Sequence, residues 1–321
     1  MKRREFLKQS VVSTLAVGAA SQLSAQTTFG NDRSVTSSGE VTGGFWPDGI
    51  RLAVSISMQF EAGAQADRGA ESPFPKIDPK YDDLPAAKWY EYGFKEGIPR
   101  LLDLFERRRV KVTSHMVGAA VDRNPQLAKE VVQRGHEASG HGQTWTPQYS
   151  MSRDEERASY EQNIQSILRA TGTRPIGFNA FWMRGTPHTL EILQDLGFIY
   201  HIDDLSRDEP FLVSVKGKPF VVVPYTLGMN DIVDYEARNF STEAYASEVK
   251  NEFDLLYAEA ENRRRMMSVS AHDRIAGRPA RAKVLEDFII YAQKHPGVAF
   301  LRKDEIARFA LNSPLTLREG I

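Results

Sequence analysis

The sequence of 321 residues contains no cysteine. Disulfides, thiolate metal ligands and cysteine nucleophiles are therefore excluded. The chain also has no excess of either charge, because 41 Lys and Arg are balanced by 42 Asp and Glu and the formal net charge is −1. This balance gives no indication of a nucleic acid or an anionic membrane as a partner. The content of 41% hydrophobic and 26% charged residues is typical of a globular protein.

A long apolar run is missing from the N-terminal stretch as well. Lys2 to Lys8 is basic and contains paired arginines, and the mildly apolar run over residues 11–20 is too short to cross a bilayer as a helix. The pattern resembles a twin-arginine export signal. We therefore expect a signal peptide over residues 1–26, a periplasmic or exported location, and no membrane span after cleavage. A disordered basic tail is the alternative.

The residues after this stretch predict a linker followed by one domain. Residues 27–44 are rich in Ser, Thr and Gly and lack an apolar period, so we expect a flexible linker. Residues 45–321 are expected to form a single catalytic domain. Within it, residues 64–89 are polar and proline-rich, and a loop of this length usually has a function such as lining a pocket. The sequence leaves the oligomeric state open, and a homo-oligomer is compatible with it.

Strand and helix patterns alternate through the predicted domain. In residues 51–58, the apolar side chains fall on every second position, which is typical of a strand. Further strands are predicted over residues 110–117, 136–142, 175–181, 198–202, 220–224, 267–271 and 298–301. Helices are predicted over residues 92–107, 125–134, 152–171, 186–196, 242–262, 279–294 and 303–311. The alternation favours an α/β fold with a parallel sheet and crossover helices.

Polar side chains recur where the predicted strands end. Gln59 and Glu61 follow the first strand, and Tyr225 and His272 follow two later ones. His141 ends another strand between two glycines, which let the backbone turn tightly and let a ligand come close. The carboxyl ends of parallel strands in a barrel share one face, and that face holds the active site. These side chains are therefore candidate site residues.

Several stretches together resemble the polysaccharide deacetylase superfamily, also called carbohydrate esterase family 4 or NodB-homology. They are the strand 51–58, K-V-T-S-H-M-V-G (111–118), R-G-H-E-A-S-G-H-G (134–142) and T-R-P-I-G-F (173–178). The resemblance covers nearly all of residues 45–311. It implies a distorted (β/α) barrel, usually of seven strands, and a zinc-dependent hydrolase that removes acetyl groups from N-acetylated sugars. In that family one Asp and two His of an H-x-x-x-H motif hold the metal.

The sequence departs from this family at both metal positions. His141 matches the first histidine of the motif, but Trp145 stands where the second would be, and an indole nitrogen cannot bind a metal. Where the family has paired aspartates, this chain has Gln59 and Glu61, or Glu61 and Ala62 in the other register. Zinc in proteins takes three or four ligands, and Glu61 with His141 supplies two at most. We therefore expect no zinc and no other cofactor.

The same departures resemble one branch of the superfamily, the cofactor-independent allantoinases and cyclic-imide hydrolases. The resembling motifs are His141-Gly142-x-x-Trp145, P-Y-T-L-x-x-N-D (224–231), and His272 followed by G-R-P-A-R-A (277–282). The branch implies hydrolysis of a cyclic amide, imide or ureide without a metal. Ala62 replaces a glycine that the branch usually has after Glu61, and the segment 178–184 keeps Arg184 without the glycines expected around it. The identity of the ring therefore stays open.

Hydrolysis of an amide needs an activated water and a proton for the leaving nitrogen. Glu61 is a candidate general base or proton shuttle, and aromatic neighbours such as Phe60 and Trp145 are expected to raise its pKa. His141 and His272 are expected to share the proton transfer, because the charge of histidine changes near neutral pH. The alternatives are a solvated loop carboxylate and histidines with structural roles.

Five other residues are candidate substrate-binding residues, and we expect them to line the pocket: Gln59, Trp145, Trp182, Arg184 and Tyr225. Arg184 can bind a carbonyl or a carboxylate with two hydrogen bonds, although a surface salt bridge is an alternative. Trp145 can form a flat wall against a planar ring, although ordinary core packing is an alternative.

The expected partner is a small cyclic amide or a glycan, with no nucleic acid. Two functions from other classes remain open beside ring hydrolysis. One is a metal-dependent deacetylase of N-acetylated polysaccharide or peptidoglycan, which needs a further metal ligand. The other is an exported binding protein that keeps the barrel without catalysis.

Overall fold

The computed structural model describes residues 45–78 and 80–320. The predicted signal peptide over residues 1–26 and the predicted linker over residues 27–44 lie outside the described residues. Among the helices of the described ranges, none has the length and hydropathy needed to cross a bilayer.

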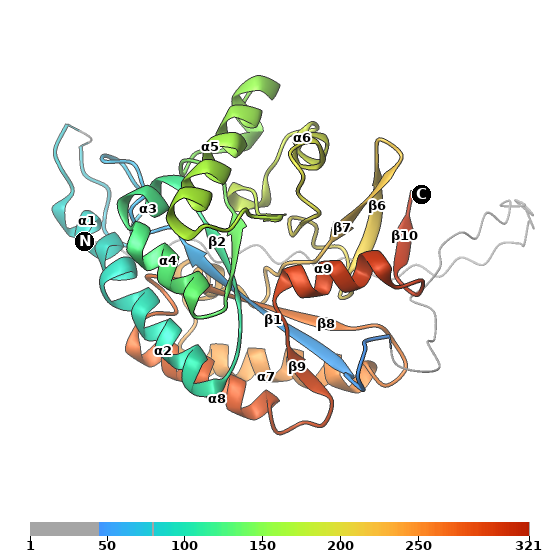
Figure 1. Ribbon diagram of the computed structural model, residues 1–321. Coiled ribbons are helices and arrows are strands. Elements are labelled where there is room, and N and C mark those ends of the chain that lie inside the picture. Colours follow the sequence, from blue (N-terminus) through green and yellow to red (C-terminus); the bar gives the residue numbers. More distant parts are fainter. Residues whose placement is uncertain (1–44, 79, 321) are drawn as a thin grey trace, which may run out of the picture. The chain divides into compact units, whose positions relative to one another are not determined.

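Parallel strands form the centre of the fold (Figure 1). There are seven of them, the number that the family resemblance implies. In spatial order they are β8 (Met266–His272), β1 (Leu52–Phe60), β2 (Thr113–Met116), β3 (Glu137–Gly140), β4 (Gly177–Phe178), β5 (Tyr200–His201) and β7 (Lys218–Val222). The segment after β7 runs along β8, where Asn230 forms a parallel bridge with Ser270 and the Ser268 hydroxyl donates to the Pro224 carbonyl at 2.6 Å. These contacts replace a full ladder and give a distorted (β/α) barrel.

Three short strands extend this sheet. β9 (Val298–Phe300) pairs with the first residues of β1 and matches the predicted strand over 298–301. β6 (Phe211–Val215) pairs antiparallel with β7, and β10 (Leu317–Glu319) pairs with β6. β6 and β10 are not among the strands predicted from the sequence. The turn between β6 and β7 has positive φ at Lys216 and Gly217, so this pair is a tight hairpin.

Helices follow most strands of the barrel. Their bounds are α1 (Leu84–Tyr92), α2 (Ile98–Arg108), α3 (Gly118–Arg123), α4 (Pro125–Gln133), α5 (Arg153–Thr171), α6 (Thr189–Asp195), α7 (Thr242–Glu259), α8 (Pro279–Ala292) and α9 (Lys303–Asn312). π-helical turns cover Gly93–Gly97 and Ile232–Ala237, and 3-10 turns cover Gln148–Ser150 and Phe181–Met183. The predicted capping box of Ser152 and Glu155 is present at the start of α5. Two helices differ from the prediction: α1 begins inside the predicted loop, where the Asp83 side chain accepts from Ala86 N, and α3 was missed.

β1 divides the interior into an apolar and a polar side. All residues of β1 are buried, because helices cover one of its faces and the barrel interior lies on the other. Its even-numbered side chains pack under α2 and α8, and α8 lies beside both α2 and α7 (Figure 1). Its odd-numbered side chains, Ser55, Ser57 and Gln59 among them, point into the barrel and are also buried. The barrel interior is therefore partly polar, and polar groups there need partners.

Two titratable groups lie buried in this interior. The Lys303 ammonium donates to Ser268 Oγ at 3.2 Å, and the Glu137 carboxylate accepts from Thr113 Oγ1 at 2.6 Å and from the Tyr200 hydroxyl at 2.7 Å. Burial lowers the pKa of Lys303 to about 7, although the charge of Glu137 opposes this shift. Burial and the charge of Asp304 raise the pKa of Glu137 to about 7.

These two pKa shifts predict that the joint contribution of Lys303 and Glu137 to the free energy of unfolding is smallest near neutral pH. The contribution of Glu137 to the free energy of unfolding is lost as pH rises from 4.5 to about 7, because its folded pKa is raised. The contribution of Lys303 is regained as pH rises from about 7 to 10.5, because its folded pKa is lowered. Urea unfolding across this pH range measures both. Lys303→Met should abolish the rise in the free energy of unfolding above pH 7, on the order of a few kcal/mol. Glu137→Gln should abolish its fall between pH 4.5 and about 7. Variants with the wild-type pH profile would contradict the assignment.

Candidate active site

The three predicted catalytic residues meet at the carboxyl ends of the strands. Glu61 follows β1, His141 follows β3, and His272 is the last residue of β8. Glu61 Oε1 lies 3.3 Å from His141 Nε2 and 3.6 Å from His272 Nε2. All three side chains are buried. The structure therefore brings the predicted carboxylate and both predicted histidines into one cluster, as the parallel strands require.

The second nitrogen of each imidazole has its own partner. His141 Nδ1 lies 2.7 Å from the Asn179 carbonyl oxygen, which can only accept, so Nδ1 carries a proton and donates it. His272 Nδ1 lies 2.6 Å from the carboxylate of Asp231. That carboxylate also accepts from the backbone N–H groups of His272 and Ala276. Both Nε2 atoms are thereby oriented toward Glu61, as partners of one ring nitrogen orient the other.

Arg274 is a member of the site that the sequence analysis missed. Its side chain is 1% exposed, and Nη1 donates to Glu61 Oε2 at 2.8 Å and to Asp273 Oδ1 at 3.3 Å. The rings of Trp89, Tyr90 and Trp145 surround the guanidinium at 4.8 to 4.9 Å from their centroids. A cation held by carboxylates and aromatic faces is stabilised without water. The sequence shows Arg274 only as the second residue after His272, which by itself gives it no role.

The charges around Glu61 correct one expectation. Burial by itself would raise the pKa of Glu61, but the charges of His272 and Arg274 lower it to about 2. The predicted rise from aromatic neighbours is therefore wrong, because nearby cations outweigh desolvation. Burial lowers the pKa of His272, while the charges of Glu61 and Asp231 raise it by more, so it lies above the usual value. Glu61 is anionic at neutral pH, and a proton on His272 is favoured.

A narrow pocket opens above this cluster. Its lining includes Glu61, His141 and His272 together with four of the predicted substrate-binding residues: Gln59, Trp145, Trp182 and Tyr225. Arg184 does not line this pocket, and its side chain is exposed. The expectation for Arg184 is therefore corrected, because the tight 3-10 turn over Phe181–Met183 brings Trp182 and Met183 to the pocket and leaves Arg184 at the surface.

Two amide side chains in the pocket have an oxygen without a hydrogen-bond partner in the part of the chain that the structure describes. Gln59 Nε2 donates to the Tyr225 hydroxyl at 2.7 Å, and that hydroxyl donates to Ser270 Oγ. Gln59 Oε1 is buried without a partner among the described residues, and so is Asn230 Oδ1. Asn230 also lines the pocket, although the sequence analysis gave it no role. Buried acceptors without partners are costly, so these two oxygens suit a ligand that brings N–H groups.

The donor set does not suit the zinc ion that the family resemblance implies. Across residues 45–78 and 80–320, no group of three or more His, Asp and Glu side chains has the arrangement of a metal site. The carboxylate that would bind the ion is already paired with the Arg274 guanidinium. A divalent cation there would be repelled by this fixed positive charge at close range. The Trp145 ring, which stands at the position of the second family histidine, packs over the same guanidinium.

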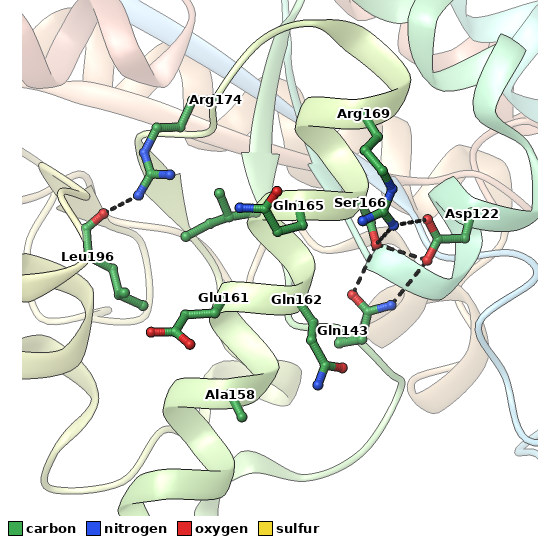
Figure 2. A pocket seen from close by; sticks show the side chains of 11 residues that line it. Asp122, Gln143, Ala158, Glu161, Gln162, Gln165, Ser166, Arg169, Arg174 and Leu196 are labelled. Atoms are coloured by element: carbon green, nitrogen blue, oxygen red, sulfur yellow. Dashed lines mark hydrogen bonds and ion pairs between the residues drawn. The ribbon is translucent and has the colours of Figure 1, made fainter.

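A second hollow lies on the surface of α5 (Figure 2). It is wide and polar, and its polar groups are largely bonded to one another. Asp122 accepts from Arg169, Ser166 and Gln143, and Arg174 donates to the Leu196 carbonyl. It contains no histidine. The narrow pocket, with its buried acid–base cluster, is therefore the candidate active site.

Comparisons with known proteins agree with this fold. Residues 78–201 match the family model described as polysaccharide deacetylase. The crystal structure of a probable polysaccharide deacetylase from Pseudomonas aeruginosa superposes with a TM-score of 0.79 at 33% identity, over 84% of this chain and 94% of that one. An allantoinase structure gives a TM-score of 0.79 at 31% identity, over 84% and 93%. A peptidoglycan deacetylase of Helicobacter pylori is 25% identical over 66% of this chain and 82% of its own.

The lowered pKa of Glu61 predicts how the protein responds to acid. A carboxylate with a folded pKa of about 2 and an ordinary value of 4.5 stabilises the fold above pH 4.5, and this contribution is lost as pH falls toward 2. Glu61→Gln should remove about 3 kcal/mol of this pH-dependent stability. Urea unfolding at several pH values below 5 measures it, with the exposed Glu161→Gln as control. If the free energy of unfolding of Glu61→Gln falls below pH 5 as that of the wild type does, Glu61 is not ionised in the folded protein.

Proposed function

The chain belongs to the polysaccharide deacetylase family, whose members are hydrolases that act on carbon–nitrogen bonds other than peptide bonds. From this premise we propose that it opens the ring of a cyclic amide, imide or ureide by general acid–base catalysis without a metal. The observation that carries the proposal is the buried Glu61 carboxylate, which lies between two imidazoles and is paired with Arg274 in place of a metal ion.

The residues of the cluster divide the proton transfers between them. Water adds its oxygen to the ring carbonyl carbon, and His141 Nε2 takes the proton that the water gives up. The ring C–N bond then breaks, and His272 gives the proton on its Nε2 to the leaving nitrogen. Glu61 Oε1 contacts both Nε2 atoms and passes a proton from His141 to His272. The ring ends as an open chain with a new carboxyl group, and both imidazoles return to their first state.

The neighbours of the cluster support these roles. Asp231 and Glu61 raise the pKa of His272 above its usual value, which suits a general acid near neutral pH. The Asn179 carbonyl holds the proton of His141 on Nδ1 and leaves Nε2 free to accept another. The free oxygens of Gln59 and Asn230 are suited to the N–H groups of a ring amide, which fixes the ring against the cluster.

A metal-dependent deacetylase of N-acetylated polysaccharide or peptidoglycan is the second candidate. The similarity to the Helicobacter pylori peptidoglycan deacetylase favours it. The two candidates differ in substrate and in metal requirement. We propose to assay hydantoin, succinimide, allantoin and N-acetylglucosamine oligomers with one preparation of the enzyme, because ring opening and acetate release are separate readouts.

Metal removal is the first test. Protein purified without added metal and treated with a chelator should contain far less than one zinc per chain, keep its fold and keep its ring-opening activity, because its carboxylate is paired with a guanidinium. Elemental analysis, circular dichroism and the hydantoin assay measure the three properties. Zinc at nearly one ion per chain, removed together with the activity, would contradict the proposal.

The proton relay is tested by two variants and their combination. Glu61→Gln and His272→Ala should each lower kcat by about a hundredfold or more, the usual scale for acid–base residues. The double variant should lose little more than either single one, because the residues act as one unit. Steady-state kinetics measure this, and His188→Ala, an exposed histidine outside the pocket, is the matched control. Multiplicative losses in the double variant would show two independent roles.

A further inference from the structure

A larger chamber adjoins the narrow pocket. It lies beneath residues 69–77 and has a volume of about 720 Å³, against about 40 Å³ for the narrow pocket. Trp145, Trp182 and Ile232 line both spaces. The loop that the sequence analysis expected to line a pocket does so here. Because the two spaces share three lining residues, they adjoin, and we expect one ligand to reach both, with its reacting part near Glu61.

The walls of this chamber are largely aromatic and apolar. They include Trp89, Tyr90, Trp145 and Trp182 on one side and Phe74, Ile77 and Tyr81 from the covering loop. Phe74, Ile77 and Tyr81 are 43%, 48% and 60% exposed, which is unusual for three apolar side chains close together in sequence. Flat apolar groups pack well between aromatic rings. The chamber therefore offers apolar surface that a ligand would cover.

Three of the five charged side chains that line the chamber are engaged elsewhere, and the other two, Glu71 and Lys76, are exposed on the covering loop. Asp83 caps α1 by accepting from Ala86 N at 3.1 Å, and Glu236 pairs with Arg281 at 2.8 Å. Arg274 is bound to the carboxylates of Glu61 and Asp273. A glycan carries a hydroxyl on most of its carbons and loses affinity where these find no partner. This wall favours an apolar group over a sugar.

Trp182 stands at the boundary of the two spaces in a strained backbone. Its φ and ψ are 51° and 29°, and the following Met183 has a φ of 57°. Bulky residues rarely adopt this left-handed region, and glycine adopts it without cost. The ring is nevertheless 41% exposed, so packing alone does not account for a tryptophan here. Strain that persists at the edge of a pocket points to a role in binding.

We propose that the chamber binds an apolar, aromatic substituent of the ring that is opened in the narrow pocket. The substrate is then a substituted cyclic amide, of which 5-benzylhydantoin is the simplest example, and not a small polar ureide. The inference rests on the proposed ring-opening function. It adds a specificity determinant formed by Trp182 and by the loop residues Phe74 and Ile77.

The test compares hydantoin with 5-benzylhydantoin, using both enantiomers of the latter. The benzyl compound should have a KM lower by about tenfold or more, because a buried phenyl ring adds apolar contact. Phe74→Ala and Trp182→Gly should each reduce this preference about tenfold. Glycine relaxes the left-handed backbone at position 182, so Trp182→Gly should fold at least as stably as the wild type. Tyr149→Ala, an exposed aromatic side chain that lines neither space, is the matched control and should keep the preference.

The outcomes separate this inference from the function on which it rests. Equal KM values for the two hydantoins, or a preference that survives both variants, would overturn the inference while ring opening stands. If neither ring is opened, the proposed function fails. Equilibrium binding of 5-benzylhydantoin, measured by tryptophan fluorescence, then tests whether the chamber binds an aromatic group. Binding that Phe74→Ala weakens and Tyr149→Ala does not would support it. Absence of binding, or turnover of N-acetylglucosamine oligomers alone, would refute it.

Discussion

The buried ion pair between Arg274 and Glu61 is the interaction on which the rest of the site depends. Taking a guanidinium and a carboxylate out of water is costly, and their attraction repays that cost only when further partners complete the shell. Here Asp273 and three aromatic rings complete the shell of Arg274, and two imidazoles complete that of Glu61. Removal of either partner would leave a buried charge uncompensated. The pair therefore fixes both the position and the ionisation of the carboxylate.

The surrounding backbone is built to hold this pair in place. The Asp273 carboxylate accepts from the backbone N–H groups of Glu61 and Ala62 at 3.0 and 2.7 Å, which ties the loop after β1 to the loop after β8. The π-helical turn before α2 packs directly on the second loop. A Cβ atom at Gly97 would overlap the carbonyl oxygen of Asp273, so only glycine permits this approach. The aromatic residues of α1 then reach Arg274 from the same side.

The barrel is shared with other members of the family, and the proposed function places the Arg274–Glu61 ion pair at its centre. The chain and the Pseudomonas aeruginosa protein share the fold over most of both lengths. In the proposed mechanism the positive charge next to the carboxylate comes from an arginine, which needs no cofactor and cannot lose its proton. A guanidinium holds a carboxylate ionised but cannot activate water as a metal ion does. The proton transfers then fall to the two histidines, whose outer nitrogens are held by Asn179 and Asp231.

The sequence by itself determined the seven parallel strands and the positions of Glu61, His141 and His272 at their ends. Alternating apolar residues mark a strand over residues 51–58 and parallel strands end on one face, while the number of seven comes from the family resemblance. Only the tertiary structure decided that Arg274, 213 residues from Glu61 in sequence, lies against it, that Asn230 faces the pocket and that Arg184 does not. It also reversed the sign of the shift at Glu61. A pKa depends on every charge within a few ångströms, and the chain brings those charges together only when it folds.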